Sequence, residues 1–281
     1  MCIVTFFPNS EGFIFTSNRD EKYQRKTLEP TTYQHPTPLI YPKDIEQGGT
    51  WFAVAPKKKQ LVCLLNATGT QPDPNLKISR GQLPIQLLLN DQTILSKSTL
   101  AKIAPFQLIK VCFLEVPRLE SFHWDGVHLI NKTLDATKPQ IWSSNTLYNE
   151  AKKQSLKNDF KSSLNNFYQW IDLISFHEKV AQPVNNSVFL KKEFGLQTVS
   201  ITSLKHQNKQ LDLWGQWNTF TRNENYLLKG EFRYRNFPDK FYGIGNRSLK
   251  QNEEKYAYDL LSFKSLFLKK NNWNNLIKNK Y

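Results

Sequence analysis

The sequence has few of the features that mark secreted or membrane-spanning proteins. It contains only three cysteines, and their positions show no disulfide-framework spacing. This argues for a reducing compartment and makes the cytoplasm the expected location. No apolar run approaches the roughly 18 residues that a membrane-spanning helix needs. The first apolar run is short and has no basic region before it, so no signal peptide is expected.

Motifs for several common chemistries are also missing. The chain has no Gly-rich phosphate loop, no serine nucleophile elbow and no Cys-x-x-Cys pair. Its histidines are scattered, and the closest two, His123 and His128, flank a hairpin turn expected at Asp125-Gly126. Neither has a cysteine or carboxylate partner at zinc-like spacing. We therefore expect no metal site.

The net charge is +14, but the basic residues do not follow a nucleic-acid-binding pattern. Lys57, Lys58 and Lys59 lie between two apolar runs, where a polar hairpin turn is expected. No RRM, zinc-finger or helix-turn-helix pattern occurs, so no nucleic-acid partner is expected. The 39% hydrophobic content, with seven Trp and 19 Phe, is sufficient for a globular core.

The most informative segment is the start of the chain, Met1-Cys2. Initiator methionine is normally removed before a small residue, so Cys2 is expected to carry both a thiol and the α-amino group. The ordinary pKa values of these groups are about 8.5 and about 7.7 to 8.0, neither far from neutrality. A nucleophile and a general base would then belong to one residue.

Two strand-like runs, 3–7 and 13–16, are separated by turn residues and predict a β-hairpin. Antiparallel pairing brings Arg19 and Asp20 back beside Cys2. A guanidinium near a thiol favours the thiolate, and Asp20 is expected to hold the terminal ammonium or to orient Arg19. The competing interpretation is that Cys2 is accidental and that the charged run is a solvated turn.

Farther along, the pattern alternates between strands and helices. Cys63 and Cys112 lie in apolar strand-like runs and are expected to be buried free thiols. Asn66 ends one strand, where its side chain can line a cleft. The order of the expected elements, strands, helices, strands, a helix and strands again, matches sheets sandwiched between helices. One or two helices are expected within 81–104 and a single helix over about 147–176. Strands are expected at 51–55, 61–66, 106–116, 119–124, 127–130, 198–204 and 210–217.

Six short motifs follow one another along the chain: Met1-Cys2-Ile3, Asn18-Arg19-Asp20-Glu21, Gly48-Gly49-Thr50-Trp51, Asn66, Ser79-Arg80-Gly81 and Ser144-Asn145. In order and spacing they resemble the NRDE family, which includes the eukaryotic transport and Golgi organisation 2 proteins, over residues 1–222. The resemblance implies an α+β fold of the N-terminal nucleophile hydrolase type, a four-layer αββα sandwich. It also implies a distant similarity to cysteine amidases such as penicillin V acylase and choloylglycine hydrolase.

In those amidases the terminal cysteine attacks an amide carbonyl, with an arginine and an aspartate beside it. By resemblance, Asn66 and Asn145 match two asparagines that help to bind the oxyanion and to fix the amino terminus. Substrate contacts are expected from Asn18 and Trp51. The implied catalytic set is Cys2, Arg19, Asp20, Asn66 and Asn145.

Three functions are compatible with this resemblance. The first is cysteine-dependent hydrolysis of a small, non-peptide amide without a cofactor. The second is non-catalytic handling of haem, lipid or acyl-CoA, with which eukaryotic relatives are linked. In that case the same cleft would hold a hydrophobic ligand. The third is an interaction domain whose active site has decayed. Family members often carry Gly-Thr-Arg-Ser where this chain has Gly195-Leu196-Gln197-Thr198, so Gln197 replaces an arginine.

Residues 223–281 have a different character. Segment 227–246 resembles the first strand and turn of a bacterial outer-membrane β-barrel of the surface-antigen type, and 256–268 would be the next strand. Two or three strands cannot close a barrel, and an open edge in lipid leaves backbone groups unpaired. We therefore predict a short β-rich extension, derived from a fusion or truncated reading frame and poorly ordered or loosely packed on the first domain.

Overall fold

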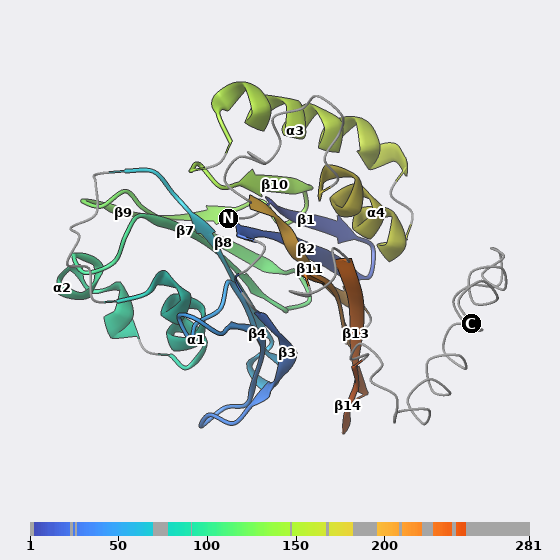
Figure 1. Cartoon of the computed structure of the whole chain (residues 1–281), viewed down its shortest axis with the longest axis horizontal. Coiled ribbons are helices and arrows are strands. Elements are labelled where there is room, and N and C mark those ends of the chain that lie inside the picture. Colours follow the sequence, from blue (N-terminus) through green and yellow to red (C-terminus); the bar gives the residue numbers. More distant parts are fainter. Residues whose placement is uncertain are drawn as a thin grey trace, which may run out of the picture.

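Two antiparallel β-sheets lie face to face, with helices packed against them (Figure 1). The structure is a computed structural model. It describes residues 3–22, 25, 27–69, 78–90, 92–146, 148–166, 169–181, 196–207, 210–220, 227–237 and 240–245.

Sheet A contains the amino-terminal hairpin. Val4 of β1 pairs with Ser17 of β2, which confirms the predicted hairpin. The sheet order is β10-β1-β2-β11-β12-β13-β14, so β2 lies between two other strands. The bounds are β1 Ile3–Asn9, β2 Gly12–Lys22, β10 Gln140–Ser143, β11 Leu196–Gln207, β12 Gln210–Phe220, β13 Leu227–Phe237 and β14 Lys240–Gly245.

Sheet B is a meander in which each strand pairs with the next along the chain. The predicted lysine turn is a 3₁₀ turn, Pro56–Lys58, between β5 and β6. The second predicted turn, at Asp125-Gly126, joins β8 to β9. The bounds are β3 Thr27–Tyr33, β4 Leu39–Asp44, β5 Phe52–Ala55, β6 Gln60–Asn66, β7 Phe106–Cys112, β8 Arg118–Trp124 and β9 Leu129–Leu134.

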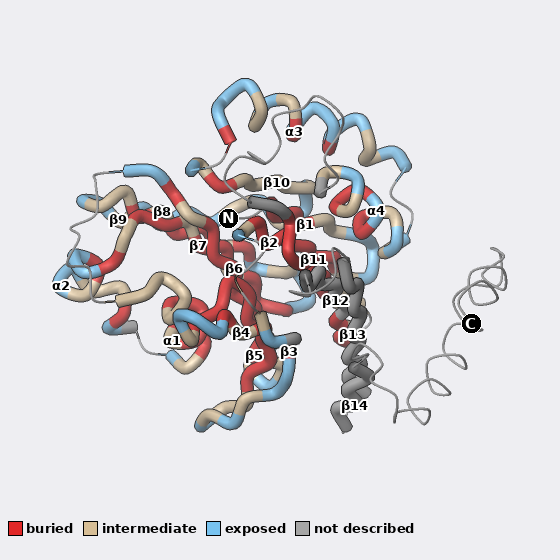
Figure 2. Tube along the Cα trace, in the orientation of Figure 1, coloured by how far each residue is buried: buried red, intermediate tan, exposed pale blue. Residues whose placement is uncertain are grey.

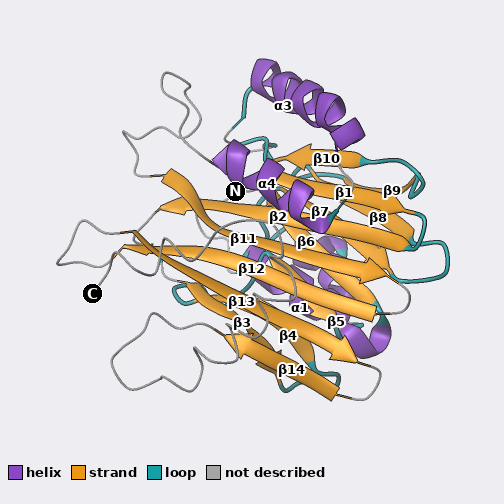
Figure 3. Cartoon of the chain, turned by 90° about the vertical axis from the view of Figure 1, so that its right-hand side faces the viewer, coloured by secondary structure: helices purple, strands orange, loops and turns teal. Residues whose placement is uncertain are grey.

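The helices contact both sheets. α1 (Leu83–Leu88) packs against β5 and β6, and α4 (Trp170–Ala181) packs against β2 and β11. In Figure 3, α4 crosses in front of β1 and β2. The other helices are α2 (Lys97–Leu100), α3 (Glu150–Ser163) and the 3₁₀ turns Arg80–Gln82, Gln92–Leu95 and Leu164–Asn166. Among the described residues, no helix is long and apolar enough to span a bilayer.

The helical stretch predicted within 147–176 is two helices rather than one. α3 ends at a 3₁₀ turn and α4 begins at Trp170. Ser162 and Ser163 both donate their hydroxyls to the carbonyl oxygen of Asp159. Such side-chain bonds to the backbone weaken a helix where they occur. The apolar periodicity therefore continues from α3 into α4, although the helix itself is interrupted.

The hydrophobic core lies between the two sheets. Phe6 and Phe15 of sheet A and Phe52 and Phe106 of sheet B are fully buried, and the Phe15 and Phe52 rings lie 6.0 Å apart. Buried segments accordingly gather in the centre of the molecule (Figure 2). Each such side chain contributes about 2 to 3 kcal/mol by burial. Two further core residues confirm the predicted buried free thiols, Cys63 and Cys112.

Part of the predicted extension continues sheet A. β13 pairs antiparallel with β12 along its length, and β14 pairs with β13. The predicted boundary at residue 222 falls between β12 and β13. The strand predicted at 256–268 lies outside the described residues.

Candidate active site

One pocket, with a volume of about 130 Å³, collects most of the sequence motifs. Its wall comes from the end of β2, the segments before β5 and before α1, and the end of β6. Asp44 and Arg25 also belong to it. Four of the six motifs contribute to the lining, with Arg19 and Glu21, Gly49 to Trp51, Asn66, and Ser79 to Gly81.

Alternation along β2 sends neighbouring motif residues to opposite faces of sheet A, because successive strand side chains point in opposite directions. Phe15 and Arg19 face sheet B, where Phe15 meets Phe52 and Arg19 meets Asp44. Asn18 instead contacts His177 of α4, on the outer face. The charged run is therefore a buried, two-sided stretch of a central strand, and the solvated-turn interpretation is wrong.

Arg19 is held by three contacts and is only 3% exposed. Its Nη2 donates to Asp44 Oδ2 at 2.7 Å, and its Nη1 donates to the Thr27 hydroxyl. The guanidinium carbon lies 4.3 Å from the centroid of the Trp51 ring, in a cation–π contact. These contacts fix both the position and the plane of the guanidinium.

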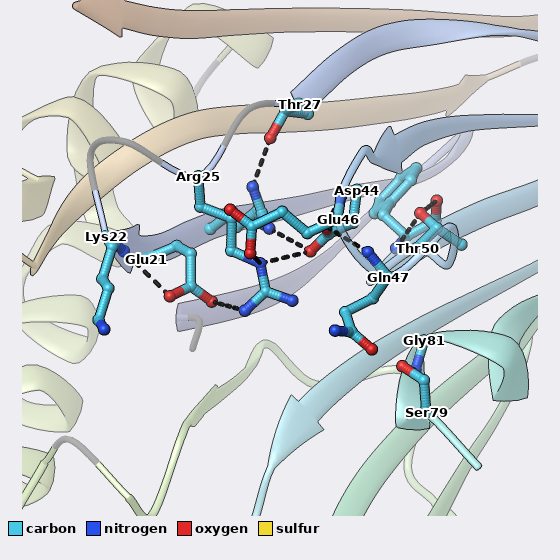
Figure 4. Close-up of polar contacts among 12 residues, drawn as sticks. Glu21, Lys22, Arg25, Thr27, Asp44, Glu46, Gln47, Thr50, Ser79 and Gly81 are labelled. Carbon is cyan, nitrogen blue, oxygen red and sulfur yellow. Dashed lines mark hydrogen bonds and ion pairs between the residues drawn. The ribbon is translucent and has the colours of Figure 1, made fainter. Parts of the chain in front are cut away.

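Asp44 joins two arginines to a tight turn (Figure 4). Its Oδ2 lies 2.7 Å from Arg19 Nη2 and 2.8 Å from Arg25 Nε. Its Oδ1 accepts the backbone N–H groups of Glu46 and Gln47, at 2.9 and 3.1 Å. Asp44 therefore sets the position of the charged groups on this part of the wall.

Arg25 extends the network towards the end of β2. Its Nη1 donates to Glu21 Oε2 at 3.0 Å. Positive and negative side chains thus alternate along the wall in the order Arg19, Asp44, Arg25, Glu21.

Two glycine motifs meet backbone to backbone at the wall. The Thr50 N–H donates to the Gly81 carbonyl oxygen at 2.9 Å. A Cβ placed on Gly49 would lie 2.6 Å from the carbonyl carbon of Gly81, and a Cβ on Gly81 would lie 3.1 Å from Gly49 Cα. Only residues without a side chain permit this approach. The contact holds Trp51 and Arg80, the neighbours of these residues, on adjoining parts of the pocket.

Asn66 ends β6 and is tied to the end of β10. Its carbonyl oxygen accepts the Asn145 N–H at 3.3 Å and the Ser144 hydroxyl at 3.0 Å. Its side-chain amide lines the pocket and makes no hydrogen bond within the described part of the chain. The amide N–H groups are therefore available to a ligand oxygen.

Asp20 is 1% exposed and lies on the outer face of sheet A. Its carboxylate accepts hydrogen bonds from the Tyr148 hydroxyl at 2.8 Å and the Thr198 hydroxyl at 2.6 Å. Burial raises the pKa of Asp20 above its ordinary value, and these two hydrogen bonds act in the opposite direction. A carboxylate in this setting is held in one orientation.

Asn18 binds α4 to sheet A. Its Nδ2 donates to the His177 carbonyl oxygen at 3.1 Å, which leaves Oδ1 to accept from His177 Nδ1 at 2.6 Å. His177 Nε2 then accepts from the Thr5 hydroxyl at 2.8 Å. Burial lowers the pKa of His177 to about 3, so the ring is neutral and carries its proton on Nδ1.

Arg80 completes the charged lining. Its Nη1 donates to the Pro105 carbonyl oxygen at 2.9 Å. Burial lowers the pKa of Arg80, and the negative charge of Glu21 acts in the opposite direction. Arginine remains protonated despite such shifts, so the pocket contains a third positive charge.

A family model described as Transport and Golgi organisation 2 matches residues 1–212. The chain belongs to the Transport and Golgi organisation 2 family. This confirms the resemblance that the motifs predict, and the matched segment contains all six of them. It ends within β12. No curated protein matches the chain at a significant level.

The fold of this family member is similar to that of a solved N-terminal nucleophile hydrolase, penicillin V acylase from Agrobacterium tumefaciens. The TM-score is 0.50 at 9% sequence identity, and the superposition covers 82% of this chain and 85% of that chain. At this identity the likeness concerns the fold alone.

The structure brings the predicted site residues of this Transport and Golgi organisation 2 member together in part. Arg19, Trp51 and Asn66 line the pocket, and Asn145 reaches it through the carbonyl oxygen of Asn66. The side chains of Asn18 and Asp20 bind partners on the outer face instead. Cys2 lies outside the described residues. Gln197 pairs with Glu21 in the sheet, and its side chain also lies outside what is described.

Four charged lining residues were not expected to be functional: Glu21, Arg25, Asp44 and Arg80. Arg80 belonged to a motif quoted for the family resemblance but carried no assigned role. The segment from Asp44 to Gly48 has the composition of an Asp-initiated turn, which predicts the turn but not the bond to Arg19. Within the described ranges, no three His, Cys, Asp or Glu side chains gather as a metal-binding set.

Proposed function

We propose that this chain is a cysteine-dependent amidohydrolase with the four-layer αββα sandwich of N-terminal nucleophile hydrolases. Cys2 is the nucleophile and a small amide is the substrate. The observation that carries the proposal is the convergence of Arg19, Trp51 and Asn66, from three separate motifs, on one pocket.

The start of β1 supports this assignment. Ile3, the residue after Cys2, pairs with Ser143 of β10, and the next residue along, Ser144, donates to Asn66. On the other side of the strand, Val4 pairs with Ser17, two residues before Arg19. β1 therefore begins at the end of the sheet where the pocket residues gather.

The reaction needs a base, a nucleophile and an oxyanion donor. The α-amine of Cys2 takes the thiol proton, and the thiolate attacks the amide carbonyl carbon. The free side-chain N–H of Asn66 donates to the developing oxyanion. The carbon–nitrogen bond then breaks, and the terminal ammonium returns its proton to the leaving amine. Water hydrolyses the thioester with the same amine as base, which releases a carboxylic acid and restores the thiol.

Other residues hold these groups in place. Asp20 and Asn145 position the amino terminus in this proposal. Arg19 contributes positive charge near the thiol, which favours the thiolate, while Asp44 and Trp51 keep its guanidinium fixed. Because Asp44 offsets much of that charge, Arg19 acts mainly through position.

Handling of haem or of a long acyl chain is less well supported. Ligands of that kind need a large and mostly apolar cavity. The pocket described here is small and is walled by Arg19, Arg25, Arg80, Glu21 and Asp44. Its size and charge suit a small polar ligand.

The first experiment is the intact mass of the purified protein before and after brief exposure to limiting iodoacetamide at neutral pH, followed by peptide mapping. We expect loss of Met1 and a single adduct on Cys2. Cys63 and Cys112 are internal controls, because they are 0% and 5% exposed. Retention of Met1, or a Cys2 no more reactive than the buried thiols, would overturn the proposal.

The second experiment is a hydrolysis screen of small N-acyl compounds, with released amine as the readout. Cys2→Ala is expected to abolish turnover, and Cys112→Ala, which removes a thiol from the end of β7, is expected to retain it. Turnover that survives Cys2→Ala would assign the activity to another group.

A further inference from the structure

The arginines of the pocket wall are not equally paired with carboxylates. Asp44 is shared by Arg19 and Arg25, and Glu21 is bonded to Arg25. Among the described residues, no carboxylate lies within ion-pair distance of the remaining cation, Arg80. Among the described residues, the lining has three positive and two negative side chains, and the carboxylate of Glu46 lies 3.6 Å from Arg25. Arg80 is then the one described lining arginine that has no described carboxylate partner.

Arg80 is also fixed in a way that suits ligand binding. One end of its guanidinium donates to the Pro105 carbonyl oxygen, and its other N–H groups make no hydrogen bond to the described residues. Both neighbours of Arg80 in the chain, Ser79 and Gly81, are held by hydrogen bonds. Ser79 accepts the Gly81 N–H at 3.3 Å, and Gly81 accepts the Thr50 N–H at 2.9 Å. Little conformational freedom remains to be lost when an anion binds.

Among the described residues, the indole N–H of Trp51 is an unpaired donor beside the pocket, buried beneath its wall rather than open to it. Trp51 is 6% exposed and lines the pocket, and its indole N–H is buried without a hydrogen-bond partner in the described part of the structure. An unsatisfied buried donor costs about 1 to 3 kcal/mol. The contact between Gly49 and Gly81 keeps Trp51 and Arg80 on adjoining parts of the wall. With the N–H groups of Arg80 and Asn66 that have no partner among the described residues, the described wall offers donors to a ligand that supplies acceptors.

We propose that Arg80 binds a carboxylate of the substrate, so that the substrates are N-acyl-α-amino acids. A guanidinium matches a carboxylate through paired N–H donors. The small pocket also contains the free amide of Asn66, so the carboxylate must lie close to the scissile amide. An N-acyl-α-amino acid has a single carbon between the two groups. The carboxylate site rests on the pocket alone, and the N-acyl substrate class rests on the proposed amidohydrolase function.

The test compares N-acetylglycine with N-acetylglycinamide, which has the same shape and no charge. Binding to Cys2→Ala protein is measured by calorimetry or ligand-observed NMR, and hydrolysis by the wild type is measured separately. We expect the acid to bind about tenfold to a hundredfold more tightly than the amide, since hydrogen bonds to charged groups are of this strength. The ratio of kcat/KM values is expected to favour the acid similarly.

Arg80→Gln is expected to remove this preference, by weakening binding of the acid much more than binding of the neutral amide. Arg80→Lys, which keeps the charge but not the paired donors, should retain part of it. Arg118→Gln is the matched control, because Arg118 is an exposed arginine of β8 that does not line the pocket. It should leave the preference intact.

The two hypotheses fail separately. If the protein binds the acid through Arg80 but hydrolyses nothing, the carboxylate site stands and the amidohydrolase function fails. If amides are hydrolysed without preference for the acid, or if Arg80→Gln weakens both ligands equally, the carboxylate site is refuted. An equal loss with Arg118→Gln would also refute it, since the effect would then come from net charge.

Discussion

Replacement of Asp44 by Asn is the perturbation that tests the charged wall most directly. The side chains of Arg19 and Asp44 are 4% and 10% exposed, and they lie 2.7 Å apart. The substitution keeps the size of the side chain and an oxygen for the turn bonds to Glu46 and Gln47. It removes the negative charge and places an amide N–H₂ donor where Oδ2 accepts from Arg19 and Arg25, so a buried guanidinium loses its counter-ion and its acceptor.

The expected loss of stability follows from that burial. Removal of one partner from a buried ion pair typically costs about 3 to 5 kcal/mol, because the other charge remains desolvated and uncompensated. Asp44→Ala should cost about 2 kcal/mol more, since it also removes two backbone-to-side-chain hydrogen bonds at about 1 kcal/mol each. The difference between the two variants separates the charge from the turn.

Urea denaturation followed by tryptophan fluorescence is a suitable assay, with a shift of the midpoint at constant slope as the sign of a true stability change. Glu46→Gln is the control, because the Glu46 side chain is 57% exposed and lies 3.6 Å from Arg25. An exposed pair of this kind contributes at most about 1 kcal/mol. A loss below about 1 kcal/mol for Asp44→Asn would show that Arg19 does not depend on this carboxylate.

Three further predictions concern other parts of the structure. Gly49→Ala should destabilise the protein by about 1 to 3 kcal/mol, and more than Gly81→Ala, because its Cβ would meet backbone at 2.6 Å rather than 3.1 Å; equal melting temperatures for the two variants would contradict this. Tyr148→Phe should raise the pKa of Asp20 further, by removing a hydrogen bond that lowers it, as measured from the carboxyl ¹³C shift; an unchanged or lower pKa would argue against that bond. The pKa of His177 is about 3 in the fold against 6.5 ordinarily, so the unfolded chain binds the extra proton, and stability falls as pH decreases from about 6.5 towards 3, by up to about 1.4 kcal/mol per pH unit. Urea titrations between pH 7 and pH 5 should show a shallower pH dependence for His177→Gln, and the same slope in both proteins would refute the assignment.

The sequence predicts the strands and helices of this fold better than it predicts the contacts between them. Alternation and turn residues locate the hairpin of β1 and β2, because both signals are local. The predicted second strand ends at Thr16, whereas β2 continues to Lys22. The residues beyond Thr16 are polar, and a polar run after a strand ordinarily indicates a solvent-exposed turn. It is buried here only because distant residues, such as Tyr148 and Asp44, satisfy it.

The same reasoning explains why the candidate site was predicted only in part. Family motifs locate Arg19, Trp51 and Asn66 at the pocket, but a motif does not state which face of a strand each residue occupies. That assignment depends on register, since adjacent residues point in opposite directions. Asp44 lies in a turn of ordinary composition, so its partners become evident only when β2 and β4 are placed together.

The two faces of β2 divide the polar motif into side chains that bind the outer layer and side chains that face the pocket. Asn18 and Asp20 bind α4, β11 and the residues before α3, and so fasten the outer layer to sheet A. Arg19 and Glu21 face the pocket. Buried polar groups stabilise a fold only when fully partnered, and those described on the outer face are. On the inner face, Arg80 and the indole of Trp51 have donors that find no acceptor among the described residues. A fold that satisfies its polar groups on one face of a strand, and leaves donors unpaired beside the other, has the composition expected of a binding site for an anion.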